Sequence, residues 1–193
     1  MKTKVFAICT FFGLTVFMSS CTKEEIVSVT EGNGVVELTE KNNAPGAQPI
    51  AQIAIDAGFS ELVSALVYVD TELNAGLVDL FLNGTDQYTV FAPTNEAFMN
   101  LYSALGVDSI DDLPADLVLS VLQYHVVEGR RASNSVVPKK NNKTISTLLG
   151  VDFTVNPQAQ ITAVGNTANI VAADISASNG IIHVIDAVIL PIN

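Results

Sequence analysis

Two histidines and two cysteines are the side chains in this sequence that could provide nucleophilic or metal chemistry. His183 and Asp186 form a His-x-x-Asp pair inside an apolar run of β-branched residues. In a β-strand the period of two places these two side chains on opposite faces, so they cannot share a metal ion. Zinc also requires two or three His or Cys ligands with a carboxylate at set spacing. We therefore expect each side chain to satisfy buried polar partners on its own face.

A nucleophile paired with a general base is the second kind of chemistry to consider. Such a pair needs a Ser or Cys presented on a strained turn beside a His, and the sequence contains no Gly-x-Ser-x-Gly. Ser176 and Ser178 lie near His183, but Ser is common beside turns. Residues 108–112 lack the alternating ligands of a calcium loop, and no glycine-rich phosphate loop is present. We predict no catalytic residue, no metal and no cofactor.

The element that holds the His-x-x-Asp pair is predicted to be an interior strand over residues 179–191. Asn179 and Gly180 read as a two-residue hairpin turn because both tolerate positive φ, and Pro191 ends the strand because it lacks an N–H. A strand that is apolar on both faces is buried on both faces. One face carries Ile182, Val184, Val188 and Leu190, and the other carries Ile181, Ile185, Ala187 and Ile189.

The remaining chain reads as helices that mostly precede strands, which indicates the α+β class. Helical spacing begins at Pro49, resumes with Ser60 as an N-cap, and is expected to restart at Thr71. Thr94 and the acid-terminated turn at residues 109–112 are further N-terminal caps. The expected strands are residues 88–91, 144–149, 151–155, 160–164, 170–175 and the strand described above.

Length and charge limit the classes of function that this chain can have. The chain has 193 residues, a formal net charge of −11 and a pI near 4.3. The length predicts one domain with additional segments. The acidic balance argues against nucleic acid as a partner, because phosphate binding needs a basic face.

The N-terminus reads as an export signal. Residues 1–4 are basic and residues 5–18 form an apolar stretch of 14 residues, too short to span a membrane comfortably. Small residues before Cys21 resemble a bacterial lipoprotein signal, in which residues 1–20 are removed and the cysteine receives lipid. The alternative is an ordinary secretion signal with an incidental cysteine. Without the signal, Cys21 has no disulfide partner, and the chain keeps seven basic against 20 acidic residues, a net charge of −13.

Residues 21–46 read as a lipidated start and a flexible tether with a reach of roughly 25–30 Å. A hairpin within residues 26–40 is an alternative for part of it. The acidic residues directly after Cys21 resemble a surface-export signal of some Gram-negative lipoproteins, although such residues are also common in any solvated tether. These features predict an exported, lipid-anchored protein in the outer membrane, facing the cell exterior, that contacts membrane through its anchor only.

Four ordered motifs point to a family. Residues 88–98, the pair Tyr124–His125, residues 147–150 and residues 179–191 resemble, in order and spacing, the sequence boxes of fasciclin-type domains. The resemblance covers about residues 47–193 and departs from the family pattern at Asn95, where Asp is frequent. We expect a structural role for the motif residues Thr94, Asn95, Asn179, Gly180, His183 and Asp186.

The resemblance implies one domain, a β-wedge of about seven strands packed with helices, in which the first and last boxes are neighbouring strands. It also implies adhesion, or binding to an extracellular protein or glycan, and no catalysis. In animal relatives the tyrosine–histidine motif and an Asp-Ile pair before the last box are associated with integrin adhesion. The matching residues Tyr124, His125, Asp174 and Ile175 are thus candidates for partner binding.

The segment of residues 130–143 is basic, although neither the fold nor the family requires basic residues there. It contains Arg130, Arg131, Lys139, Lys140 and Lys143. It is either a solvated edge that discourages strand aggregation or a patch for an anionic partner or for acidic regions of neighbouring copies. We expect the functional surface here and near Asp174. Adhesion is the favoured function, glycan capture through Tyr68 and Tyr102 is the alternative, and an enzyme is the least favoured of the three.

Overall fold

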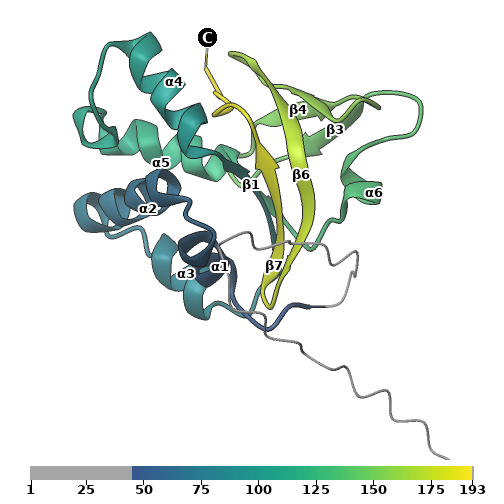
Figure 1. Ribbon diagram of the computed structural model, residues 1–193, viewed down its shortest axis with the longest axis horizontal. Coiled ribbons are helices and arrows are strands. Elements are labelled where there is room, and N and C mark those ends of the chain that lie inside the picture. The colour runs from purple at the N-terminus through teal and green to yellow at the C-terminus, as the bar shows by residue number, and fades with distance from the viewer. Residues whose placement is uncertain (1–44, 193) are drawn as a thin grey trace, which may run out of the picture. The chain divides into compact units, whose positions relative to one another are not determined.

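The computed structural model describes residues 45–192 (Figure 1). The predictions of a signal over residues 1–20, of lipidation at Cys21 and of a hairpin in residues 26–40 lie outside the described residues. No helix within residues 45–192 is both long and apolar enough to cross a membrane.

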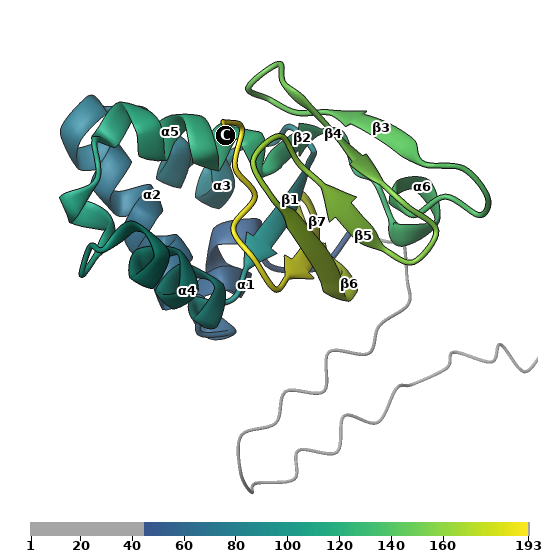
Figure 2. The same cartoon turned by 90° about the horizontal axis from the view of Figure 1, so that it is seen from above.

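Helices α1–α5 form one side of the fold, and a curved sheet together with the short helix α6 forms the other (Figures 1 and 2). The helices are α1 Ile50–Asp56, α2 Ser60–Leu73, α3 Leu77–Asn83, α4 Asn95–Leu105, the 3₁₀ turn η1 Ile110–Asp112, α5 Ala115–Tyr124 and α6 Ser133–Val136. The strands are β1 Tyr88–Pro93, β2 Val126–Glu128, β3 Lys143–Ser146, β4 Asp152–Val155, β5 Gln160–Thr162, β6 Thr167–Ala177 and β7 Gly180–Ile185.

The seven strands follow the order β2-β1-β7-β6-β5-β4-β3. β1 and β7 are parallel neighbours, with Tyr88 opposite Gly180 and Pro93 opposite Ile185, while the other pairs are antiparallel. A hydrogen bond of 2.7 Å from Leu148 N to Val126 O links the two ends of the sheet, so it is nearly closed. The predicted α+β class, the seven strands and the pairing of the two boxes are confirmed.

Two hydrophobic cores lie on the two faces of β7 and of the segment that follows it, as the alternation predicts. The predicted strand over residues 179–191 is too long, because β7 ends at Ile185 and residues 186–191 have no strand structure. Ile182, Val184 and Val188 belong to the core under the helices. Ile185 and Ile189 belong to the core enclosed by the curved sheet, where Phe91, Phe153 and Tyr124 meet edge to face. Because the strand borders both cores, it fixes the helices and the sheet against each other.

The predicted helix start at Thr71 is wrong. α2 runs through it to Leu73, and the break comes at Asn74 and Gly76, which have φ of 52° and 71°. The Asp70 carboxylate, carried by α2, accepts hydrogen bonds of 2.8 Å from Leu77 N and Val78 N. The Asp70 side chain therefore caps the N-terminus of α3 although it belongs to α2. Helical periodicity in the sequence does not reveal a cap that lies seven residues before the helix.

The predicted turn at the start of β7 is shifted by one residue. Ser178 and Asn179 form the turn and Gly180 is already paired with Ala177. Gly180 does not have positive φ. A Cβ there would lie 2.1 Å from Tyr88 O and 2.7 Å from Ile50 Cδ1. The glycine is required because β1 and α1 approach the backbone closely.

Two local caps are confirmed. Thr94 Oγ1 accepts a hydrogen bond of 3.2 Å from Ala97 N at the start of α4. Ser109 and Asp112 form the reciprocal bonds of a capping box around η1. Both caps join residues three positions apart, which is why the sequence alone could locate them.

Candidate partner-binding surface

The motif residues of the two boxes tie distant elements together. Asn179 is buried; its Oδ1 accepts from Ile50 N at 2.8 Å and its Nδ2 donates to Phe81 O at 3.0 Å. Asn95 accepts from Glu61 N and donates to Gly58 O, so it joins α4 to the start of α2. These amides hold α1, α2 and α3 in place and are not available to a partner.

His125 is buried where α5 meets β2. Its Nε2 accepts a hydrogen bond of 3.1 Å from Ile189 N, so the ring proton is on Nδ1, which donates to Val121 O at 2.7 Å. Burial lowers the pKa of His125 to about 4, against a smaller opposing effect of the Val121 carbonyl. The imidazole is therefore neutral and fastens the C-terminal segment to α5.

His183 is fully buried in β7 and joins three segments. Its Nε2–H donates to Arg131 O at 2.9 Å and its Nδ1 accepts from Asp174 N at 3.3 Å. Burial lowers its pKa, and the Arg131 carbonyl and the Asp174 carboxylate partly oppose that shift. As expected, the side chain satisfies buried polar partners.

The expectation for Asp186 is wrong in one respect: the residue is exposed and lies just after β7, beyond the strand. Its carboxylate accepts hydrogen bonds from Asn169 N at 2.7 Å and Asn169 Nδ2 at 2.8 Å. It fastens the start of β6 to the end of β7 at the surface. His183 and Asp186 therefore have separate partners and do not converge.

The residues matched to the integrin-associated motifs are interior or engaged. Tyr124 and His125 are buried, and Ile175 contributes to the core under the helices. Asp174 has φ of 65°, and its carboxylate accepts hydrogen bonds from Ser133 N and Ser133 Oγ at the start of α6. These four side chains thus make contacts that hold the fold together, and their role as partner contacts stays a prediction.

Arg130 is likewise a structural residue. Its guanidinium is partly buried and donates to the Ala177 and Gly180 carbonyls, to Gln87 Oε1 and to Ser176 Oγ. Burial lowers its pKa. The planar fork of Arg matches this set of converging acceptors around the β6–β7 turn. The sequence suggested a surface charge because it did not show where these carbonyls lie.

The rest of the basic segment, residues 130–143, is more open. Lys139 and Lys140 are exposed between α6 and β3, and Lys143 is partly exposed with its Nζ donating to Ser135 O. Arg131 donates through Nε to Glu128 O at 3.2 Å. Of the predicted partner-binding residues, the lysines present the most accessible charge.

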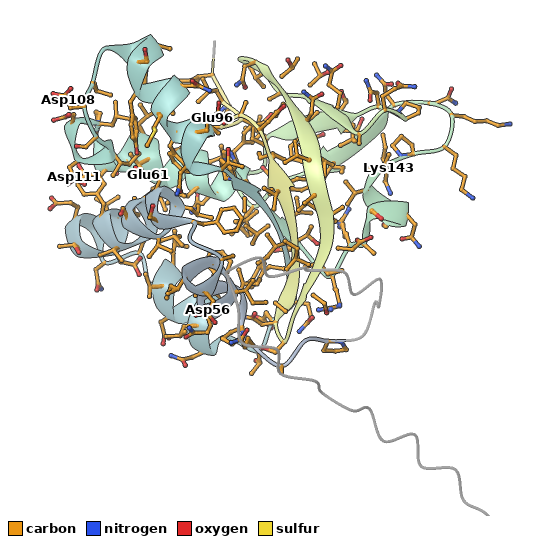
Figure 3. All side chains as sticks on the ribbon, in the orientation of Figure 1. Asp56, Glu61, Glu96, Asp108, Asp111 and Lys143 are labelled. Carbon is orange, nitrogen blue, oxygen red and sulfur yellow. The ribbon has the colours of Figure 1, made fainter. Side chains whose placement is uncertain are left out.

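A second surface feature was visible in the sequence and was overlooked. Residues 50–124, which comprise α1–α5 and β1, contain eleven acidic residues and no Lys or Arg. Figure 3 shows Asp56, Glu61, Glu96, Asp108 and Asp111 spread over the helical side, away from Lys143. Lys143 and these acidic side chains therefore lie on opposite sides of the domain.

An apolar cavity of about 90 Å³ opens at one end of the helical side. Leu105 and Ile192, each about half exposed, lie among its lining residues, together with Ile110, Leu113 and Leu117. The exposed Asp108, Asp111 and Asp116 are within two residues of this lining. This end of the domain therefore combines an apolar cavity with acidic residues that are close in sequence to its lining.

The model of the fasciclin domain matches residues 57–191, and the chain belongs to the fasciclin domain family. Three curated relatives illustrate what the chain is similar to. Immunogenic protein MPB70 of Mycobacterium bovis (strain ATCC BAA-935 / AF2122/97) is 38% identical over 135 residues, which cover 68% of this chain and 64% of that protein. The match thus spans slightly less than two thirds of that relative.

Two relatives match over more of the chain. Cell surface glycolipoprotein MPB83 of Mycobacterium bovis (strain BCG / Tokyo 172) is 32% identical, over 83% of this chain and 71% of that protein. Protein sll1483 of Synechocystis sp. (strain PCC 6803) is 32% identical, over 99% of both chains. Among solved structures, a FAS1 domain pair of the insect cell adhesion molecule fasciclin I has 19% identity and a TM-score of 0.48, covering 68% of this chain and 45% of that one.

Proposed function

We propose that this chain is an exported, lipid-anchored surface protein whose fasciclin domain mediates adhesion by binding an extracellular protein. The observation that carries the proposal is the likeness to a protein named a cell surface glycolipoprotein over 83% of the chain. The export signal and Cys21 support it, since a lipidated cysteine with several acyl chains gives stable anchoring. The anchor belongs in the outer membrane and faces the exterior.

A protein partner is favoured over a glycan because of the aromatic residues. Carbohydrate sites display exposed aromatic rings, and the chain has no Trp. Within residues 45–192 no Phe or Tyr is exposed. Tyr102 is buried with its OH donating to Glu61 Oε2, and Tyr68 OH donates to Leu113 O. Glycan capture remains the alternative, and binding on a glycan array by the full chain would revive it.

The two histidines support binding rather than catalysis. Both rings are buried, and each uses one nitrogen to donate to a carbonyl and the other to accept from a backbone N–H. A general base must reach the proton that it abstracts. Within the described residues, no group of three or more His, Cys, Asp or Glu side chains is arranged to hold a metal ion.

Replacing Cys21 with Ala tests the anchoring. The variant should move from the membrane to the soluble fraction and lose the mobility shift that acyl chains cause, while the matched variant Cys9→Ala should stay with the membrane. Protease added to intact cells should remove the wild-type domain if it faces the exterior. Unchanged membrane association of Cys21→Ala would reject the anchor, and a domain protected from the protease would reject surface display.

A further inference from the structure

Charge is segregated in the described domain to an unusual degree. All five of its basic residues lie within residues 130–143, whereas residues 50–124 carry eleven acidic residues and no basic one. Figure 3 places Lys143 on one side and five labelled acidic side chains on the other. Residues 125–192 also carry Glu128, Asp152, Asp174 and Asp186, so their formal net charge is +1 against −11 for residues 50–124. This difference gives the domain a basic and an acidic pole, and complementary potentials orient proteins as they meet.

We propose that two copies of this chain associate head to tail, the basic segment of one docking on the η1 end of the other. The η1 end comprises Asp108, Asp111 and Asp116 together with Leu105 and Ile192 at the apolar cavity. The inference deepens the proposed function, on which it rests for the location of the copies, by naming a second copy as a partner.

The η1 end is singled out from the rest of the acidic side by its apolar cavity, since exposed apolar side chains such as Ile55 and Met99 also occur elsewhere on the helices. Leu105 is 51% exposed and Ile192 is 53% exposed, and both line the cavity of about 90 Å³. Charge pairs at an exposed rim contribute little on their own, so a stable contact also needs buried apolar area. This end offers acids and apolar surface together.

The basic segment carries the complementary set. Val137 and Pro138 are partly exposed and directly precede the exposed Lys139 and Lys140. Val137 also packs against the enclosed core, so Pro138 and the exposed part of Val137 would lie over the cavity while the two lysines face Asp111 and Asp116. The chain therefore contains both halves of the contact, which is why a second copy is the occupant that we assign.

The opposite placement of the two poles determines the kind of assembly. A contact between two different surfaces is heterologous, so each added copy leaves one pole of each kind unoccupied, and the result is a row rather than a closed pair. Anchoring copies by lipid to one membrane raises their effective concentration, so a weak contact suffices to form such rows on the cell surface.

Salt should affect the association in a characteristic way. Residues 45–192 carry fifteen acidic and five basic side chains, a formal net charge of −10, so two copies repel each other at long range. At about 0.1 M salt the Debye length is about 10 Å. Salt at this concentration therefore screens the long-range repulsion more strongly than it weakens the attraction between opposite charges in contact. We expect association at about 0.1 M NaCl and its weakening by at least about tenfold at about 0.5 M.

The test is sedimentation velocity of the full chain carrying Cys21→Ala, so that no lipid drives association. In this background Lys139→Glu/Lys140→Glu reverses the basic pole, and Asp111→Lys/Asp116→Lys reverses the acidic pole. Each variant alone should associate at least about tenfold more weakly at 0.1 M NaCl. An equimolar mixture should associate again, because each variant then offers the other a complementary pole.

The matched control is Asp56→Lys/Asp79→Lys, which makes the same change in charge on exposed residues of α1 and α3, away from the η1 end. It should associate like the parent, and circular dichroism should show that every variant is folded. A parent that stays monomeric to about 0.5 mM, a control that disrupts equally, or a mixture that stays monomeric would each overturn the proposal. Because this assay uses neither anchor nor cells, its failure leaves surface anchoring and adhesion to be judged by fractionation and cell assays.

Discussion

Acidification should destabilise this domain through His125, whose imidazole must stay neutral in the folded state. Nε2 accepts the Ile189 N–H, and a proton there would place two donors against each other. Nothing charged compensates, since the ring lines a small cavity that is otherwise apolar except for Gln123. Protonation therefore breaks the link between α5 and the C-terminal segment.

The magnitude follows from the pKa of His125, which burial lowers from 6.5 to about 4. Because the folded pKa lies below the unfolded one, the contribution is fully present above about pH 6.5 and is lost as the pH falls toward 4. Linkage at 1.36 kcal/mol per pKa unit gives a loss of about 2 kcal/mol between pH 7 and pH 5 and about 3 kcal/mol by pH 4.

The assay is urea unfolding followed by far-ultraviolet circular dichroism, since the chain has no Trp for fluorescence. His125→Gln is the matched variant, because its amide oxygen can still accept from Ile189 N but does not titrate. It should be less stable than the parent at pH 7 and lose about 2 kcal/mol less on going to pH 5. The difference between the two slopes removes the effects of His183 and of the carboxylates, which both proteins share.

Parallel pH profiles of the parent and His125→Gln would refute this reasoning. A second measurement avoids dependence on the variant: the imidazole resonances of the parent, followed by NMR from pH 8 downward. A His125 that titrates near 6.5 in the folded protein would show that the ring is not held neutral, whatever the unfolding curves give.

Three further predictions concern single contacts, each measured by urea unfolding at pH 7. Gly180→Ala should lower the free energy of unfolding by about 3 kcal/mol, because its Cβ meets the backbone of β1. Gly106→Ala has open space around its Cβ but a φ of 69°, and should lower it by about 1–2 kcal/mol. Equal losses would contradict the close-approach argument. Asp70→Ala should cost about 1 kcal/mol by exposing two N–H groups at the start of α3, and an unchanged midpoint would show that water replaces the cap. Arg130→Ala should cost about 2 kcal/mol, while Lys139→Ala should stay within about 0.5 kcal/mol, and the reverse order would make Arg130 a surface residue.

Local patterns could be predicted from the sequence because the residues that make them are neighbours. The Thr94 cap and the capping box at Ser109 follow from side chains that reach backbone groups three residues away. The alternation in β7 correctly predicted a strand with two buried faces, since the period of two is a property of the extended backbone. The separation of acidic and basic residues along the chain can be found by counting Lys and Arg in the sequence.

The candidate site was harder, because the sequence gives residue types but not distances between segments. Arg130 and Lys139 are equally cationic in sequence, yet only Arg130 lies where the β6–β7 turn leaves carbonyls to satisfy. Asp174 and Ile175 were expected at the surface, but Asp174 caps α6 and Ile175 packs under the helices. Periodicity cannot distinguish these outcomes, since the deciding partners are 40 or more residues away.

The α+β class and the acidic balance could be predicted from hydrophobic period and composition, which need no knowledge of contacts. The family and the pairing of the two boxes came from the resemblance of four ordered motifs to fasciclin-type domains. Folding was needed to show that His183 bonds to Arg131 O and Asp174 N, that Gly180 lies against β1, and that Lys143 lies away from the labelled acidic side chains. The physical reason is that burial and hydrogen bonding depend on which distant backbone groups folding brings within about 3 Å of a side chain.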